Sequence, residues 1–212
     1  QILTVQYRMK RNIGNLISQV FYDGKIATEV DDKNRTHPIK KFEGKSIVWI
    51  DTSMMNEKDE DRLKGGSFCN YIENTIIKKL LECFKNENVI KDLDIGIITG
   101  YRGQKELIRK SVSNGGYDKI SKKIDINTLD AFQGRENDII IYSTVRTKNS
   151  IGFQKEKERV NVAFSRAKDL LIICGDMDFF YKFDDPDNKF VEIIDYIHEH
   201  EDECLIISGG EL

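Results

Sequence analysis

Residues 124–176 read IDINTLDAFQGRENDIIIYSTVRTKNSIGFQKEKERVNVAFSRAKDLLIICGD, and this stretch decides the fold. It holds two apolar runs rich in β-branched residues, Ile139–Val145 and Leu170–Cys174. Both runs have the length and composition of buried parallel strands. Between them, Glu158–Lys168 is expected to be helical. Strands that alternate with a helical segment predict an α/β fold with a mostly parallel sheet.

Polar groups border both runs, and packing of a core strand does not require them. The tetrapeptide QGRE at 133–136 precedes the first run, and its glycine allows close backbone approach. The predicted helix carries Arg159 and Arg166, which lie seven residues apart and would share one face. Taken alone, QGRE also fits a simple turn with an exposed ion pair. Arg159 and Lys168 equally fit solvated surface charges.

The composition fits one α/β domain of ordinary polarity. The 212 residues are enough to bury a core, and 39% of them are hydrophobic and 33% charged. No run approaches the roughly 18 apolar residues of a membrane span, so no membrane partner is expected. The four cysteines are scattered without a CxxC pair. We therefore predict a reducing, cytoplasmic location and no metal site.

The charges are unevenly distributed along the chain. The net charge of −3 argues against a generic basic nucleic-acid-binding protein. Residues 100–123 nevertheless contain seven basic and two acidic residues, whereas residues 176–212 contain twelve acidic and two basic ones. Most charge runs are solvated faces. If nucleic acid binds, we expect it to follow the middle of the chain and to avoid the end.

Several of these segments resemble superfamily one helicases, in the branch of the nonsense-mediated-decay and Sen-type helicases and their bacterial relatives. LDAFQGRENDIII (129–141) is similar to motif V, and ERVNVAFSRAK (158–168) is similar to motif VI. LTVQYRM (3–9), followed by FYDGKI (21–26), is similar to motif IV. The resemblance implies a RecA-like three-layer domain with helices on both faces of the sheet. Residues 1–212 would then be the second RecA-like motor domain of a helicase.

The resemblance also implies an ATP site shared with a first RecA-like domain. Arg8 and Arg166 would be the catalytic arginines that reach the γ-phosphate, because a planar, permanently charged guanidinium suits the charge that develops there. The residues that would contact the nucleotide are Tyr7 on the adenine, Gln133 and Gly134 along the phosphates, and Glu136 on the ribose. A carboxylate repels phosphate, so Glu136 suits only a sugar hydroxyl. The cofactor would be ATP with Mg²⁺, bound mainly by the first domain.

The start of the first helix departs from the family pattern. An apolar stripe predicts a helix; its residues are Ile13, Leu16, Ile17, Val20 and Phe21. Lys10 and Arg11 stand where the family usually has a His-Pro pair. Together with Arg8 they place cations at a helix N-terminus, where they oppose the macrodipole unless a phosphate binds.

A second group of residues predicts contact with single-stranded DNA or RNA. The strand ending at Thr99 is followed by Tyr101 and Arg102, and ligands of parallel sheets bind beyond the carboxyl ends of strands. A hydroxyl, an aromatic ring and a cation suit phosphate contact and base stacking. IGIITGYRGQ (95–104) resembles the family's I-G-V-I-T-P-Y-x-x-Q segment, which touches the nucleic-acid backbone. The resemblance adds Thr128 as a phosphate contact.

Other segments indicate structure more than chemistry. Ser67 is expected to cap a helix, and Met55–Gly66 to be a mobile surface loop. GKS at 44–46 lacks the first P-loop glycine and precedes a strand, so we interpret it as a turn. Asp176 is expected to cap a short helix, and the end of the chain to pack against the sheet.

Two functional hypotheses remain at this stage. In the first, the chain is the second motor domain of an ATP-dependent helicase and cannot hydrolyse ATP alone, because it has neither a P-loop nor a magnesium-binding strand. The resemblance implies 5′-to-3′ translocation. In the second, a degenerate motor fold binds nucleic acid or protein without catalysis. A nuclease is disfavoured because clustered carboxylates with a lysine are not found.

Overall fold

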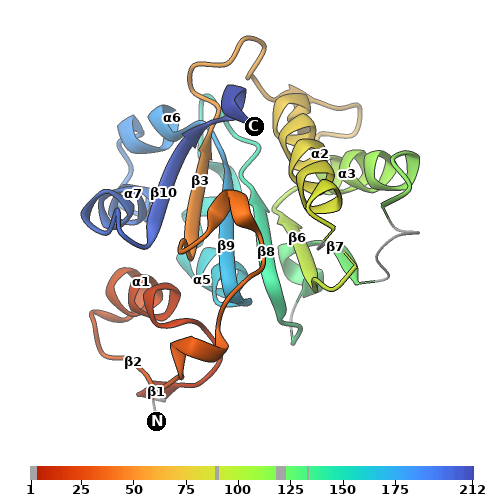
Figure 1. Cartoon of the computed structure of the whole chain (residues 1–212). Coiled ribbons are helices and arrows are strands. Elements are labelled where there is room, and N and C mark those ends of the chain that lie inside the picture. Colours follow the sequence, from red (N-terminus) through yellow and green to blue (C-terminus); the bar gives the residue numbers. More distant parts are fainter. Residues whose placement is uncertain (1–3, 89–90, 118–122, 133) are drawn as a thin grey trace.

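The computed structural model describes residues 4–88, 91–117, 123–132 and 134–212, arranged as in Figure 1. Six parallel strands form the central sheet, in the order β10-β3-β9-β8-β6-β7. They are β3 (Ile47–Asp51), β6 (Ile95–Thr99), β7 (Ile124–Thr128), β8 (Asn137–Ser143), β9 (Ala167–Gly175) and β10 (Cys204–Ser208). Short pairs lie outside this sheet: β1 (Val5–Gln6) with β2 (Ala27–Thr28), and β4 (Asp61–Arg62) with β5 (Phe68–Cys69).

Helices cover both faces of the sheet, so the predicted RecA-like three-layer architecture is confirmed (Figure 1). One face carries α2 (Tyr71–Asn86) and α3 (Arg102–Asn114). The other carries α1 (Arg11–Tyr22), α5 (Lys157–Phe164), α6 (Met177–Lys182) and α7 (Phe190–Glu199). Short 3₁₀ turns are η1 (Asp32–Asn34), η2 (Lys40–Phe42), η3 (Leu129–Phe132), η4 (Gly152–Lys155) and η5 (Gly209–Glu211). None of the described helices is long and apolar enough to cross a membrane.

Alternation along the strands fills two hydrophobic cores, one on each face. In β3, Ile47 and Trp49 point to the α1 side, while Val48 and Ile50 point to the α2 side. All four side chains are fully buried. A sheet buried on both faces explains why its strands appear in the sequence as continuous apolar runs.

Two predicted boundaries are wrong. The strand predicted to reach Val145 ends at Ser143, because Val145 has a left-handed φ of 71°. The helix predicted to reach Lys168 ends at Phe164, because β9 begins at Ala167, which pairs with Asn137. Arg166 therefore lies in the turn after α5, and it does not share a helical face with Arg159.

The cap of α2 was also predicted wrongly. Ser67 lies before β5, and the α2 N-cap is Asn70, whose side-chain oxygen accepts from the backbone N–H of Glu73 at 2.9 Å. Asp176 caps α6 as predicted, accepting from the N–H of Phe179 at 3.0 Å. The GKS segment is confirmed as a turn that leads into β3.

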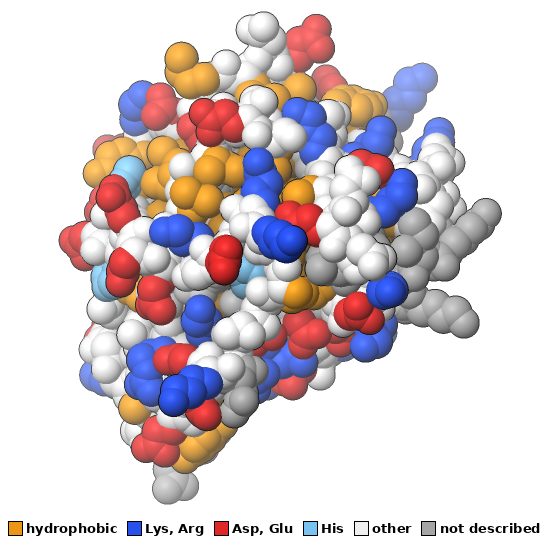
Figure 2. Space-filling view, viewed as in Figure 1, with side chains coloured by type: hydrophobic (Ala, Val, Ile, Leu, Met, Phe, Trp, Pro, Cys, Tyr) orange, Lys and Arg blue, Asp and Glu red, His pale blue; other side chains and the backbone are white. Residues whose placement is uncertain are grey.

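The sequence reading missed β10, which forms one edge of the sheet. Its outer side has no neighbouring strand among the described residues. Three of its side chains, Leu205, Ile206 and Ile207, are half-buried, and apolar surface is visible over this edge in Figure 2. The edge position explains why β10 was not predicted from the sequence, because an edge strand is buried less completely than a central one.

Candidate nucleotide and nucleic-acid sites

Gln6 shapes the turn that presents Tyr7 and Arg8. Its side-chain oxygen accepts from the backbone N–H groups of Arg8 at 2.9 Å and Met9 at 2.8 Å. Its amide nitrogen donates to the carbonyl of Met9 at 3.1 Å and to the hydroxyl of Thr28 at 2.7 Å. With both ends of its amide occupied, Gln6 fixes the backbone on either side of the arginine. The sequence reading missed this residue, although a lone glutamine beside a candidate arginine was a usable signal.

Arg8 lies at the amino edge of the sheet, beside the starts of β8 and β9. Its Nε donates to the Glu136 carboxylate at 2.5 Å, and its Nη1 donates to the carbonyl of Ser165 at 3.3 Å. The backbone N–H of Lys10 bonds the carbonyl of Lys168 at 2.7 Å. Residues far apart in sequence are thus joined at one place. Glu136, predicted on a ribose, is engaged here by Arg8.

Arg166 belongs to the same cluster. Its side chain is half-buried, and its Nε has no hydrogen-bond partner among the described residues. Burial lowers the pKa of Arg166, and the nearby positive charge of Arg8 lowers it further, while Glu136 raises it. A buried N–H without a partner costs free energy unless a ligand satisfies it. The two predicted arginines therefore lie near enough to interact electrostatically, and Arg166 has hydrogen-bonding capacity left over.

Tyr7 stands in solvent beside this cluster. It is 65% exposed, and its hydroxyl donates to Glu29 at 3.1 Å, which raises the pKa of Tyr7. The hydrogen bond at the hydroxyl therefore orients the ring, and most of the side chain is exposed to solvent. Gly134 has a φ of 83° and open space where a side chain would be. Gln133 lies outside the described residues.

The cations at the start of α1 are compensated within the chain. Asp32 accepts from the backbone N–H of Arg11 at 2.9 Å and pairs with its guanidinium at 3.1 Å. The aspartate places negative charge at the N-terminus of the helix, where the macrodipole favours it. The expected penalty for Lys10 and Arg11 in place of a His-Pro pair is therefore offset by Asp32, and no phosphate is needed there.

The carboxyl edge of the sheet holds the residues predicted to grip nucleic acid, but it exposes only some of them. Thr99 is fully buried, which contradicts its predicted role, because a buried hydroxyl offers a strand no surface. Tyr101 is 4% exposed and packs against Phe68 and Phe153 at centroid distances of 5.6 and 5.3 Å. Tyr101 therefore supports this edge from beneath, and its face is not free for stacking.

A groove lies over the carboxyl ends of β6 and β7. Its volume is about 670 Å³, in the range of ligand sites. Tyr101, Arg102 and Thr128 line it together with Lys105, so three of the four predicted nucleic-acid contacts meet here, although Tyr101 is almost fully buried. Lys105 pairs with Glu106 at 3.2 Å. The Arg102 side chain is exposed and makes no ion pair or hydrogen bond with the rest of the described chain.

A buried polar network holds this edge together. The Glu73 carboxylate accepts from the Ser143 hydroxyl at 2.5 Å, the Thr144 hydroxyl at 3.0 Å and the Val145 N–H at 2.8 Å. Burial raises the pKa of Glu73 to about 8, and these donors act in the opposite direction. Gln104 joins the network by donating to Ser143 at 3.0 Å. Positive φ at a β-branched residue costs energy, so the network stabilises the strained turn at Val145.

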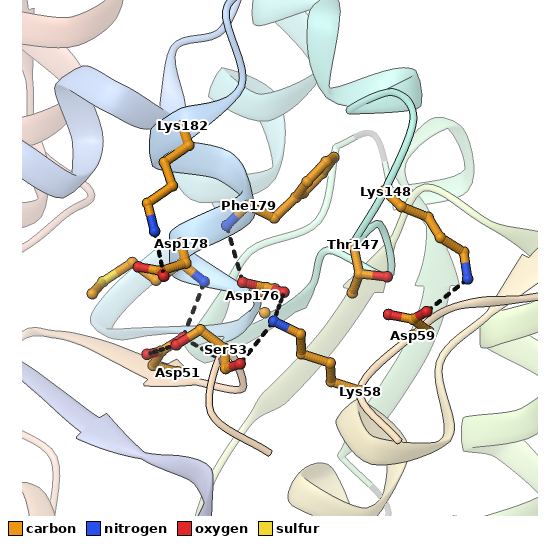
Figure 3. A network of polar contacts seen from close by, with 12 residues as sticks. Asp51, Ser53, Lys58, Asp59, Thr147, Lys148, Asp176, Asp178, Phe179 and Lys182 are labelled. Carbon is orange, nitrogen blue, oxygen red and sulfur yellow. Dashed lines mark hydrogen bonds and ion pairs between the residues drawn. The ribbon is translucent and has the colours of Figure 1, made fainter. Parts of the chain in front are cut away.

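The segment 55–66 is held in place, contrary to the expectation of a mobile loop. Figure 3 shows Lys58 reaching Asp176 at 2.7 Å and Asp59 paired with Lys148 at 2.8 Å. Glu60 is buried against Arg146 at 3.3 Å. The segment ends in Gly65 and Gly66, which line the groove. Its ion pairs therefore fix one wall of that groove.

The amino-edge cluster suits an anionic nucleotide better than a metal ion. Arg8 and Arg166 offer guanidinium donors, and Tyr7 offers an open ring. Glu136 is paired with Arg8, and the described residues contain no group of three or more His, Cys, Asp or Glu side chains placed to hold a metal ion. The cluster therefore offers donors to an anion and an exposed ring to a planar group. It supplies no evident ligand set for Mg²⁺ within the described chain.

Comparisons with known proteins found a matching family model and several similar relatives. The chain matches the family model described as "AAA domain" over residues 1–178. It is 35% identical over 182 residues to the ATP-dependent helicase NAM7 of Saccharomyces cerevisiae, covering 82% of this chain and 18% of that protein. It is 35% identical over 182 residues to the regulator of nonsense transcripts 1 homolog of Neurospora crassa, covering 82% and 16%. It is 34% identical over 184 residues to the helicase SEN1 of Saccharomyces cerevisiae, covering 82% and 8%.

The match extends over most of this chain and a small part of each relative. The chain spans less than a fifth of the length of these three relatives. The matched residues include the turn of Arg8 and the segment of Arg166, since both lie within 1–178. The chain therefore belongs to the AAA domain family, and its predicted resemblance to the second RecA-like domain of superfamily one helicases is confirmed.

Proposed function

We propose that this chain is the second motor domain of an ATP-dependent DNA or RNA helicase or translocase. Its amino edge contributes to an ATP site completed by a first RecA-like domain of the same polypeptide. Arg8 and Arg166 contact the γ-phosphate, Tyr7 packs on the adenine, and Gln133 and Gly134 line the phosphates. Mg²⁺ is held mainly by the first domain.

One observation carries this proposal: Arg8, which pairs with Glu136, and Arg166 come from distant parts of the chain and interact electrostatically, and the Arg166 Nε has no partner among the described residues. The Arg8–Glu136 pair keeps Arg8 neutralised before nucleotide binds. A γ-phosphate competes with Glu136 for Arg8, because phosphate is a strong bidentate acceptor for a guanidinium. Once released, Glu136 is free to accept a ribose hydroxyl, as the family resemblance implies.

The carboxyl edge holds single-stranded nucleic acid in this proposal. Arg102 and Thr128 contact phosphates in the groove, and the buried residues Thr99 and Tyr101 support it from below. β8 joins the two edges, running from Asn137 near the arginines to Ser143 in the polar network. Its length is about 20 Å at 3.3 Å per residue. Because β8 is a buried central strand, closure around ATP at one end moves the groove at the other as a rigid body.

The test compares the purified chain with the full-length protein. The chain alone should show no ATPase and only weak strand binding that falls steeply with salt. The full-length protein should show ATPase that single-stranded nucleic acid stimulates. Robust turnover by the chain alone would overturn the shared site. Strand binding by the full-length protein without any turnover would favour a degenerate, non-catalytic motor fold.

A further inference from the structure

Two aromatic rings that the proposed contacts do not use line the groove at the carboxyl edge, those of Phe68 and Phe153, and Phe153 is the more exposed. Phe153 in η4 lines the groove and is 41% exposed. Single exposed apolar side chains are common, so exposure by itself indicates nothing. Three further observations concern how this ring is held, what lies beside it and which charges surround it.

The ring of Phe153 stands on a fixed support. Its neighbours Ile151 and Gln154 are fully buried, and the Gln154 side chain donates to the carbonyl of Thr144. Gly152 has a φ of 62°, and a side chain there would come within 2.0 Å of the Tyr101 hydroxyl. Only glycine fits at this position. The close contact between η4 and Tyr101 therefore fixes the position of Phe153 next to the Tyr101 ring.

Two neighbouring groups contact the ring, which is partly exposed and lines the groove. The Tyr101 ring lies 5.3 Å away and tilted by 51°. The Arg159 guanidinium lies 5.2 Å from the centroid and is held in turn by Glu156 at 2.8 Å and Asp130 at 3.6 Å. Phe153 is thus a rigid aromatic surface, and the part that remains exposed faces the groove.

The charges around the groove complement a nucleic-acid strand. Arg102 stands at the first turn of α3 without a partner in the described part of the chain, and Lys105 follows one turn later. Asp130 also borders the groove, but Arg159 is within 3.6 Å of it. A cation beside an aromatic platform is the combination that holds a strand through its phosphates and bases together.

We propose that Phe153 is a stacking platform for one base of the bound single strand, while Arg102 holds the adjacent phosphate. This inference rests on the proposed function and names a contact within its groove. Stacking on a ring accepts any base, because every base has a π-face. The platform therefore suits a motor that moves along a strand without reading its sequence.

The test uses the full-length protein and two labelled strands, an ordinary homopolymer and the same backbone with abasic sites. Phe153→Ala should weaken binding of the ordinary strand by about 5- to 100-fold, the range of losing one base stack. Binding of the abasic strand should stay close to wild type, because its phosphates are unchanged. Phe153→Trp should restore binding of the ordinary strand. Tyr181→Ala, which removes an exposed ring on α6, is the matched control.

Arg102→Ala separates this inference from the function on which it rests. It should weaken both strands alike and reduce the salt dependence of binding. Suppose that Arg102→Ala weakens both strands alike, whereas Phe153→Ala has no effect or weakens both strands equally. The stacking role of Phe153 is then wrong, while nucleic-acid binding in the groove is supported. If the wild-type protein binds neither strand, both the groove and the platform are wrong.

Discussion

The two edges of the sheet are built differently. At the carboxyl edge, Glu73 and Gln104 are fully buried, and hydrogen bonds within the chain hold the groove in shape. At the amino edge, Arg8 and Glu136 have side chains 39% and 48% exposed and pair with each other. One edge is assembled by this chain alone. The other consists of partly exposed charged groups, of which Arg8 and Glu136 neutralise each other.

This difference indicates which of the two sites depends on a second domain. A network of buried hydrogen bonds is rigid because breaking any one leaves an unsatisfied polar group. An exposed ion pair is weak and exchanges its partner readily. The groove should therefore be formed before nucleic acid arrives. The arginine cluster should reorganise when a first domain brings the triphosphate.

The largest expected effect comes from Arg166. In the full-length protein, Arg166→Ala should lower nucleic-acid-stimulated ATPase by about 10³–10⁵-fold, as for other arginines that contact a transferring phosphoryl group. Arg166→Lys should not restore activity, because an ammonium lacks the planar fork of donors. Steady-state kinetics measures both. Arg62→Ala, which removes an exposed arginine on β4, is the control.

Activity of the Arg166→Ala protein within about threefold of wild type would exclude the proposed catalytic role of Arg166, since threefold corresponds to less than 1 kcal/mol of activation free energy. The amino edge would then be an ordinary charged surface. The two edges would still differ in burial and hydrogen bonding, but the difference would not indicate where catalysis takes place.

Glu73→Ala should disrupt the buried hydrogen-bond network at the carboxyl edge and destabilise the fold. It leaves two hydroxyls and the Val145 N–H without their acceptor, which should cost about 2–4 kcal/mol in the free energy of unfolding. Denaturant titration of the purified chain measures it. Thr75→Ala on the exposed side of the same helix is the control. A loss no larger than that of the control would mean that the network does not hold this edge.

The same carboxyl group should make stability depend on pH. Burial raises the pKa of Glu73 to about 8 from an ordinary 4.5, so the folded chain favours the protonated form. The unfolded chain releases this proton first as pH rises, so stability from this group should fall between about pH 4.5 and 8, by at most about 5 kcal/mol. Glu73→Gln should remove that decline. Equal slopes for both proteins between pH 5 and 8 would exclude Glu73 as the cause.

Tyr7 should give the smallest effect, because its ring is exposed. Tyr7→Ala should raise the KM for ATP of the full-length protein by about 2- to 10-fold with little change in kcat, the range of one aromatic contact. Tyr7→Phe keeps the ring and loses only the hydrogen bond to Glu29, so its KM should stay near wild type. If Tyr7→Phe is as impaired as Tyr7→Ala, the hydroxyl matters and stacking on the ring is not the explanation.

The sequence alone determined the parallel sheet, the helices on both faces and the family. It could do so because strand and helix periodicities are local, and because the turn of Arg8 and the segment of Arg166 keep the family's order. The helix that was predicted to carry Arg166 shows the limit of this reasoning. That helix ends early because β9 pairs with Asn137 across the sheet, a contact that local periodicity does not contain.

Only the tertiary structure decided which of the predicted residues a ligand can reach. Phe68 and Phe153, far apart in sequence, close over Tyr101, so the predicted stacking ring is buried and Phe153 is the exposed one. Likewise Glu136 meets Arg8 across more than a hundred residues of chain. Exposure and ion pairing depend on how distant segments pack against each other, and no window of sequence records that packing.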